Sequence, residues 1–274
     1  NLSDPDNSKK PEGMDWDLWV GPEKNNGYIP GLHAFDWRGY WDYGTGSLGD
    51  MGCHLMDVPI KALGLYDPYS VEASISRLPY IRSYTPADVS SSSVPASSIV
   101  TYRFNPSKLN DSKVKFTWMD GGLRPSQPDQ IKEDIGVGGI LIYGEKGIIS
   151  CNDYGTRAKL YIDGEVVETG QFDGIPSNSF NHYTSWVEAM VDGYGSDKHK
   201  NLNSGFDVAG PISEVVLLGN VAVRSGLLKR SPRSNVFIGR KRLDYDSKNM
   251  VITNFAQANQ FLTREYRKGW ELNI

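Results

Sequence analysis

The sequence predicts an α+β fold, with an open, largely antiparallel mixed β-sheet and helices packed on one face. In the middle of the chain apolar and polar residues alternate, as strands require, whereas near both ends apolar residues recur at helical spacing. Two short turns in the strand-rich part, 144–147 and 163–164, are typical of hairpins. No repeat or linker divides the chain, so we expect residues 1–274 to form a single domain.

The first expected element is an arm at the N-terminus. Residues 1–46 hold four of the seven tryptophans with many glycines and prolines, and we expect an irregular aromatic-rich arm whose rings mostly pack inside the protein. A helix is expected over 48–65, bent at Pro59, because an internal proline removes a hydrogen bond and clashes with the preceding turn.

After residue 65 the spacing of apolar residues changes from helical to alternating, and the remaining elements are predicted from this spacing. Strands are expected at 71–75, 99–102, 114–118, 139–143, 148–150, 159–162 and 165–167. Helices are expected over 180–191 and 208–225 and, after a basic connection, over 254–267. Long loops are expected at 90–98 and 120–138.

Composition and charge restrict the class of protein. Hydrophobic residues make up 39% and charged residues 23%, which are globular proportions. The net charge of −4 argues against a nucleic-acid partner, and we expect the basic run 229–242 to be a solvated face. No apolar run approaches the roughly 18 residues of a membrane span, so none is expected. Two cysteines, Cys53 and Cys151, are too few for a disulfide scaffold.

A glycine-rich motif precedes the first helix. Gly44-Thr-Gly46-Ser-Leu-Gly49 has the spacing of a dinucleotide-binding fingerprint. Its context does not fit, because residues 37–43 do not form a buried parallel strand and Asp50 places negative charge where a pyrophosphate needs positive potential. We therefore expect no nucleotide to bind at this motif.

Three ionisable residues follow the motif at helical spacing. Asp50, His54 and Asp57 stand at i, i+4 and i+7, so a continuous helix would place them on one face. A carboxylate beside an imidazole suits proton transfer near neutral pH. The same pattern is also compatible with a helix cap and a surface ion pair, or with a metal site. Spacing alone leaves these three interpretations open.

The wider context resembles a known family. Trp37-Arg38 followed by Gly44-x-Gly46-x-Leu48-x-Asp50-x-Gly52-x-His54 is similar to the signature of the Gfo/Idh/MocA family of NAD(P)-dependent oxidoreductases. Four further segments resemble the bacterial subgroup with an α/β C-terminal domain: 15–22, 120–122, 139–147 and 254–270.

The resemblance implies a role for each candidate residue. His54 would be the acid/base acting on a sugar hydroxyl, and Asp50 would orient the substrate or the histidine. Arg38, Trp41 and Asp57 would contact the substrate, and no metal is implied. His182 would be a second-tier substrate contact, with packing against neighbouring aromatic residues as the structural alternative.

The resemblance also implies partners. An N-terminal Rossmann domain would bind NAD or NADP, and the sheet would form subunit contacts in a homo-oligomer. Residues 1–274 contain neither that domain nor the family's Glu-Lys-Pro lysine, since Glu145-Lys146 is followed by Gly147. We therefore expect this chain to be the C-terminal domain of a longer enzyme, inactive alone.

The expected activity is oxidation of a sugar or sugar-derivative hydroxyl by a dehydrogenase. The alternatives are a redox-elimination glycosidase of the same superfamily and a non-catalytic carbohydrate-binding or assembly domain. The sequence does not fix the location. Relatives are often exported, so the bacterial periplasm would fit the resemblance and the cytoplasm is the alternative.

Overall fold

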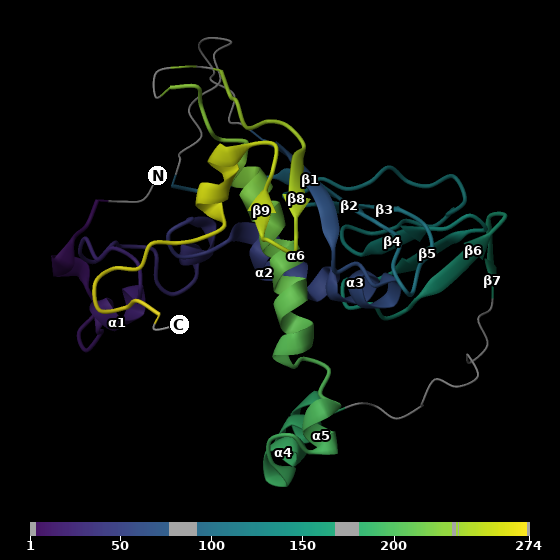
Figure 1. Ribbon diagram of the computed structural model, residues 1–274, viewed down its shortest axis with the longest axis horizontal. Coiled ribbons are helices and arrows are strands. Elements are labelled where there is room, and N and C mark those ends of the chain that lie inside the picture. Colours follow the sequence, from purple (N-terminus) through teal and green to yellow (C-terminus); the bar gives the residue numbers. More distant parts are fainter. Residues whose placement is uncertain (1–3, 77–91, 168–180, 232–233, 235, 273–274) are drawn as a thin grey trace. The chain divides into compact units, whose positions relative to one another are not determined.

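The computed structural model describes residues 4–76, 92–167, 181–231, 234 and 236–272. They form two compact units, one from Asn1–Pro125 with Val215–Ile274 and the other from Ser126–Glu214. Each unit has an antiparallel sheet and helices, so the α+β class is confirmed (Figure 1). The strands form two sheets where the sequence predicts one. That residues 1–274 make a single domain stays a prediction.

The first unit contains a five-stranded sheet in the order β3-β2-β1-β8-β9. Its strands are β1 (Pro68–Ile75), β2 (Ser98–Phe104), β3 (Val114–Met119), β8 (Leu243–Asp246) and β9 (Val251–Ile252). Its helices are η1 (Asn7–Lys9), α1 (Trp16–Val20), η2 (Asp36–Gly39), α2 (Gly46–Leu55), α3 (Asp57–Leu63) and η3 (Ala256–Phe261), together with the end of α6 (Phe206–Ser225).

One face of this sheet packs against α6. Val71 pairs with Tyr102 in the β1–β2 ladder, and both are fully buried. The Tyr102 hydroxyl donates to the carbonyl of Val216 on α6, at 3.4 Å. Glu72 and Thr101 pair at the next position and therefore lie on the opposite face. The sheet thus has an apolar face toward α6 and a polar face away from it.

The helix expected over 48–65 is two helices that meet at Met56. Pro59 has no N–H to bond to the carbonyl of Leu55, four residues earlier and the last residue of α2, so the interruption lies where the proline predicts it. In the first turn a backbone N–H has no acceptor within the helix, so proline costs little there. Gly64 ends α3 with a left-handed φ of 66°.

The second unit contains a four-stranded sheet in the order β4-β5-β6-β7. Its strands are β4 (Ile140–Tyr143), β5 (Ile148–Cys151), β6 (Lys159–Ile162) and β7 (Glu165–Val167). Both predicted hairpins are confirmed, and Asp163 and Gly164 have the positive φ values of a tight primed turn. The unit also contains α4 (His182–Asp192), α5 (Asp197–Lys200) and the start of α6.

The C-terminal prediction is wrong in two respects. Strands β8 and β9 form in the segment between the helices expected at 208–225 and 254–267, where no strand was predicted. The helix expected over 254–267 shortens to the 3-10 helix η3, because side chains there bind other backbone. The Asn259 amide accepts from the Ile252 N–H at 2.7 Å and donates to its carbonyl at 3.0 Å. Arg267 donates to the Gly21 carbonyl at 2.6 Å.

The arm has an apolar core of its own, as expected for its aromatic residues. Its buried members are Trp16, Val20, Tyr28, Ile29 and Leu32. The rings of Trp16 and Trp19 stack at 4.5 Å, and the Trp16 indole donates to the Gly27 carbonyl at 2.8 Å. Arg264 and Arg267 fasten the C-terminal segment to the arm through ion pairs with Glu23 at 2.9 Å and Asp17 at 2.6 Å.

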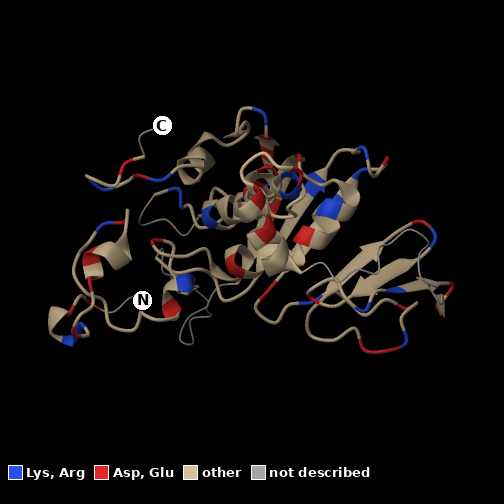
Figure 2. Cartoon of the chain, turned by 90° about the horizontal axis from the view of Figure 1, so that it is seen from below, with Lys and Arg blue, Asp and Glu red and all other residues tan. Residues whose placement is uncertain are grey.

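Charges of both signs are intermingled along the described chain (Figure 2). In the described part of the basic run 229–242, Arg240, Lys241 and Arg242 are exposed, as expected for a solvated face, and each still contacts a neighbouring residue. Arg240 stacks on the Phe237 ring at 4.3 Å, Lys241 lies over Phe255 at 4.7 Å, and Arg242 pairs with Asp244 at 3.0 Å.

Among the described helices, α6 alone has the length and apolar composition that could cross a membrane. Half of its most apolar stretch is buried inside the protein. Val215, Leu218 and Ala222 are among its core residues. A core helix passes the same test, so the absence of a membrane span stays a prediction.

Gly219 of α6 supplies a test of this packing. A Cβ there would overlap the Tyr102 hydroxyl and lie 2.6 Å from Leu48 of α2. We expect Gly219→Ala to destabilise the protein by about 1–3 kcal/mol through overpacking. Thermal unfolding followed by circular dichroism measures this loss.

Gly210 is the matched control, because it lies in the same helix and a Cβ there meets nothing within 4 Å. Gly210→Ala is expected to be neutral or stabilising by up to about 1 kcal/mol. The packing described above is wrong if Gly219→Ala melts as high as Gly210→Ala.

Candidate functional site

The candidate site is built on the turn that leads from η2 into α2. The Gly44 N–H donates to the Tyr40 carbonyl at 2.7 Å, and a Cβ on Gly44 would lie only 2.6 Å from the Arg38 Cα. Gly46, the first residue of α2, has a φ of 65° that other residues rarely adopt. The turn therefore needs glycine, and it places Arg38 beside the start of α2.

The glycines of the motif at 44–49 allow the turn and the start of α2 to pack closely against their neighbours. A Cβ on Gly49 would overlap Thr45 and lie 3.2 Å from the Asn220 amide of α6. The 3-10 helix η2 precedes the motif, whereas a dinucleotide fingerprint follows a parallel strand. Both sheets of the described residues are antiparallel. These residues do not fit a nicotinamide dinucleotide, so residues other than those described would have to hold one.

Arg38 and Asp50 come together as an ion pair. The Arg38 Nε lies 3.5 Å from the Asp50 Oδ1, and both side chains are partly exposed. The guanidinium also stacks on the rings of Phe35 at 4.4 Å and Trp37 at 4.5 Å. A partly exposed ion pair contributes at most about 1 kcal/mol to stability. The contact therefore does more for the orientation of the two groups than for folding.

His54 lies in the last turn of α2 and its side chain is exposed. Because α2 is continuous from Gly46 to Leu55, Asp50 and His54 share one face, one turn apart. Cys53, also exposed, donates its thiol to the Asp50 carbonyl at 3.4 Å. An imidazole that solvent can reach therefore stands next to a carboxylate.

Asp57 is the first residue of α3, whereas the sequence predicted it within the same helix as His54. Met56, between the two helices, keeps a helical backbone, and its N–H donates to the Gly52 carbonyl at 2.8 Å. The Asp57 Oδ1 lies 3.1 Å from the Nζ of Lys61, one turn along α3. This pair gives Asp57 a local structural role, and its contact with substrate stays a prediction.

Trp41 packs between the arm and α6. Its backbone N–H donates to the Ser92 carbonyl at 3.0 Å, and its ring faces the Arg224 guanidinium at 5.4 Å. The Arg224 guanidinium also lies over the ring of Phe261 at 4.5 Å, so one cation contacts two aromatic rings. The Trp41 Nε1 is buried and has no hydrogen-bond partner in the described structure. Its role in substrate binding stays a prediction.

Asp42, next to Trp41, is a carboxylate with a perturbed pKa that sequence reasoning did not single out. Burial raises the pKa of its carboxyl above the ordinary value, and nearby Glu23 raises it further, whereas Arg224 opposes the shift. Burial also lowers the pKa of Arg224. It raises the pKa of Tyr43, and the neighbouring charge of Asp42 raises that pKa further. No sequence pattern marks Asp42, because its partners come from α6 and the arm.

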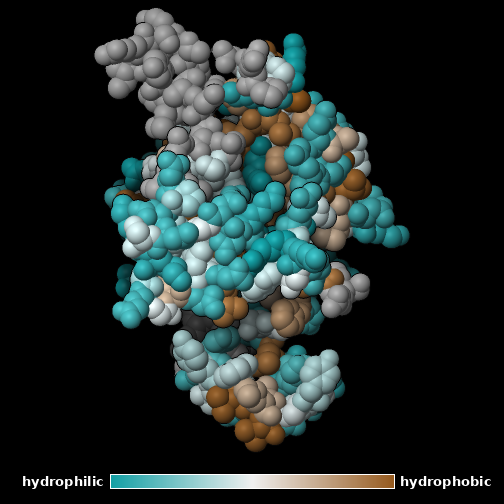
Figure 3. Space-filling view, turned by 90° about the vertical axis from the view of Figure 1, so that its left-hand side faces the viewer, coloured by the Kyte–Doolittle hydropathy of each residue, from teal (hydrophilic) through white to brown (hydrophobic). Residues whose placement is uncertain are grey.

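His182 belongs to the second unit and is the first residue of α4. Its ring lies 5.8 Å from the ring of Tyr183. Several apolar side chains of α4 are exposed, and Figure 3 shows brown residues on the surface of this segment. Trp186, Val187 and Met190 are among them. A substrate contact of His182 stays a prediction.

No group of three or more His, Cys, Asp or Glu side chains within the described ranges could hold a metal ion.

The comparisons with known proteins bear on the same residues. Residues 3–76, about a quarter of the chain, match the family model described as "Oxidoreductase family, C-terminal alpha/beta domain" of the Gfo/Idh/MocA proteins. This segment holds Arg38, Trp41, Asp50, His54 and Asp57 but not His182. No curated protein matches the chain. The resemblance is confirmed for residues 3–76, which are similar to the C-terminal alpha/beta domain of the Gfo/Idh/MocA oxidoreductase family.

Proposed function

We propose that this chain supplies the substrate-binding and acid/base part of an NAD(P)-dependent dehydrogenase acting on a sugar or sugar-derivative hydroxyl. The observation that carries the proposal is the Asp50–His54 pair on one face of α2, with Arg38 3.5 Å from Asp50. This pair lies inside the segment that matches the oxidoreductase family. An imidazole and a carboxylate one turn apart are suited to moving a proton at a substrate hydroxyl.

In this proposal His54 accepts the proton of the carbinol hydroxyl while the carbon is oxidised. Its exposed position on α2 lets a substrate reach it. The Asp50 carboxylate, oriented by Arg38, accepts a hydrogen bond from a neighbouring hydroxyl or from the imidazole. Charge-assisted hydrogen bonds of this kind are shorter and stronger than neutral ones, and they fix the bound orientation.

The remaining substrate contacts belong to the same proposal. Trp41 and Asp57 lie on either side of α2 in the sequence, and His182 would reach the substrate from α4. The hydride acceptor, NAD or NADP, would be held by the protein's own N-terminal Rossmann domain. The assembly would be a homo-oligomer through the sheet.

The first experiment is on the full-length natural protein. We expect denaturation to release one NAD(H) or NADP(H) per chain, identified by chromatography. A sugar panel followed at the nicotinamide absorbance then separates the activities, because a redox glycosidase would cleave glycosides with no net NADH. A full-length protein that binds no nucleotide under any condition would contradict the dehydrogenase and leave a carbohydrate-binding or assembly domain.

His54→Ala tests the acid/base role. We expect kcat of the full-length enzyme to fall about a hundredfold, which is typical of a lost general base, with little change in melting temperature because His54 is exposed. Cys53→Ala changes the adjacent exposed residue of the same helix and is expected to keep normal turnover. The assignment is wrong if His54→Ala leaves kcat within about twofold of the parent.

Arg38→Gln tests the orientation of Asp50. The substitution keeps length and polarity but removes the charge that faces the carboxylate. We expect kcat/KM to fall about tenfold or more, whereas stability changes by at most about 1 kcal/mol, as for a partly exposed ion pair. Steady-state kinetics and thermal unfolding of the same preparation measure the two effects. Equal and large losses of both would show that Arg38 only holds the fold.

A further inference from the structure

One aromatic residue of the arm differs from the others in its exposure. Of the phenylalanine, tyrosine and tryptophan residues described within 4–46, Phe35 alone is exposed, with 68% of its surface open to solvent. Trp16 and Tyr28 are buried in the core of the arm, and the remaining rings are partly buried. A single exposed apolar side chain is ordinary on a protein surface. The role of Phe35 therefore depends on what lies beside it.

Phe35 lies against Arg38, which belongs to the candidate site. The guanidinium carbon of Arg38 lies 4.4 Å from the centre of the Phe35 ring. The Arg38 Nη1 and backbone N–H both donate to the Phe35 carbonyl, at 3.3 Å and 3.4 Å. On its other side, the Arg38 Nε lies 3.5 Å from the Asp50 Oδ1. One arginine thus connects the exposed ring to the carboxylate of α2.

These contacts place an apolar surface next to the polar groups of the site. The ring centre and the Asp50 oxygen are at most about 9 Å apart, because a C–N bond of about 1.3 Å joins the two contacts of Arg38. The Arg38 and Asp50 side chains are partly exposed, and His54, one turn along α2, is exposed. A ligand in solvent can therefore reach the ring and the ionisable groups together.

A cyclic sugar has both kinds of surface that this arrangement offers. Its hydroxyls donate and accept hydrogen bonds, whereas the C–H groups on one face form a flat, apolar and weakly positive patch. The face of an aromatic ring is electron-rich, so such a patch packs on it favourably. An open-chain polyol has no rigid flat face, and it would lose more conformational freedom on the same ring.

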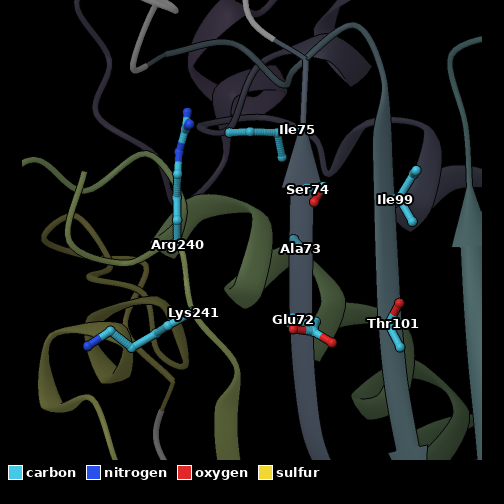
Figure 4. Close-up of a pocket in the computed structure, with 8 residues that line it drawn as sticks. All are labelled: Glu72, Ala73, Ser74, Ile75, Ile99, Thr101, Arg240 and Lys241. Atoms are coloured by element: carbon cyan, nitrogen blue, oxygen red, sulfur yellow. The ribbon is translucent and has the colours of Figure 1, made fainter. Parts of the chain in front are cut away.

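A groove elsewhere in the first unit lacks such a ring. It has a volume of about 470 Å³ and lies along β1 and β2 (Figure 4). The residues that line it are Glu72, Ala73, Ser74, Ile75, Ile99, Thr101, Arg240 and Lys241. None of these is aromatic, and the Glu72 carboxylate is already paired with Arg103 at 2.6 Å. The groove therefore offers a sugar ring no platform, and it provides a control for the test.

We propose that Phe35 contacts the substrate, and that its ring packs on the C–H face of a cyclic sugar and selects the ring form over the open-chain polyol. The inference rests on the proposed function, which places the sugar hydroxyls at His54 and Asp50. It adds a class of substrate, a pyranose with a flat C–H face, and a contact outside the ionisable residues.

The experiment uses the full-length holoenzyme with glucose, galactose, mannose and xylose. The sugar with the highest kcat/KM is compared with its own alditol as a competitive inhibitor. We expect the inhibition constant of the alditol to exceed the KM of the sugar at least about tenfold, because only the cyclic form offers a preorganised face.

Phe35→Leu keeps an apolar side chain but removes the flat ring. We expect the KM of the sugar to rise about tenfold, as for a lost aromatic contact. We expect kcat, the KM of the nucleotide and the inhibition constant of the alditol to stay within about twofold, because His54 and Asp50 remain in place. Phe35→Tyr restores a ring and is expected to keep the parent KM.

Two variants serve as matched controls. Leu18→Ala removes another exposed apolar side chain of the arm, which is 66% open to solvent. Ser74→Leu narrows the groove of Figure 4 from an exposed position on β1. Both are expected to keep the parent KM of the sugar. Thermal unfolding confirms that each variant is folded.

Four results would overturn the inference. The first is an unchanged sugar KM in Phe35→Leu. The second is an equal rise for the sugar and its alditol, since the ring would then act only by holding Arg38. The third is a rise confined to the KM of the nucleotide, which would place the ring against the nucleotide-binding domain. The fourth is a rise in Ser74→Leu as large as in Phe35→Leu, which would place the sugar in the groove.

Failure of the proposed function is a separate result. A full-length protein with no nucleotide and no turnover of any sugar contradicts the dehydrogenase. Calorimetric titration of the same four sugars then decides the inference. Binding that Phe35→Leu weakens about tenfold would support the ring contact, and binding that is absent or unchanged would overturn it.

Discussion

The close approach of α2 to α6 is the constraint on which the candidate site depends. Gly49 and Gly52 of α2 face Asn220 and Val216 of α6, and Gly219 of α6 faces Leu48 of α2. A side chain at any of these glycines would meet a neighbour within 3.3 Å. The helices can approach because the Cβ atoms are missing. α6 in turn packs on the sheet through Tyr102. The position of Asp50 and His54 is thus fixed by the core.

Arginine side chains connect this packed core to the N-terminal arm. Arg224 lies one turn beyond Asn220 on α6. Its guanidinium contacts the rings of Trp41 and Phe261. Trp41 belongs to the turn that carries Arg38, and Phe261 belongs to the C-terminal segment. Arg267 then ties that segment to the first turns of the arm. The turn beside α2 is therefore held by parts of the chain more than 150 residues away.

Local patterns predicted the elements whose causes are local. The two hairpins of the second unit follow from alternation and from turn residues such as Asp163-Gly164, and both are confirmed. The shared face of Asp50 and His54 follows from helical spacing alone. Likewise, the site residues of α2 needed only the motif and its spacing.

Features that depend on distant partners were not predictable in this way. Strands β8 and β9 are short and form only because β1 offers an edge. The C-terminal segment looked helical, but Asn259 bonds to the backbone of β9 instead. Two sheets form where strand periodicity alone suggested one.

Asp42 shows why such long-range effects matter for chemistry. It follows Trp41 directly, in the turn that carries Arg38, and its pKa is raised mainly by burial. Arg224, whose positive charge opposes this rise, has its own pKa lowered by burial. The ring contacts of Arg224 help to offset the cost of holding its charge in a partly buried place. Perturbed pairs of this kind occur in structural networks and are enriched at functional sites. Asp42 follows Arg38 by four residues, so the group with the perturbed pKa and the Arg38–Asp50 ion pair are both held by the turn that leads into α2.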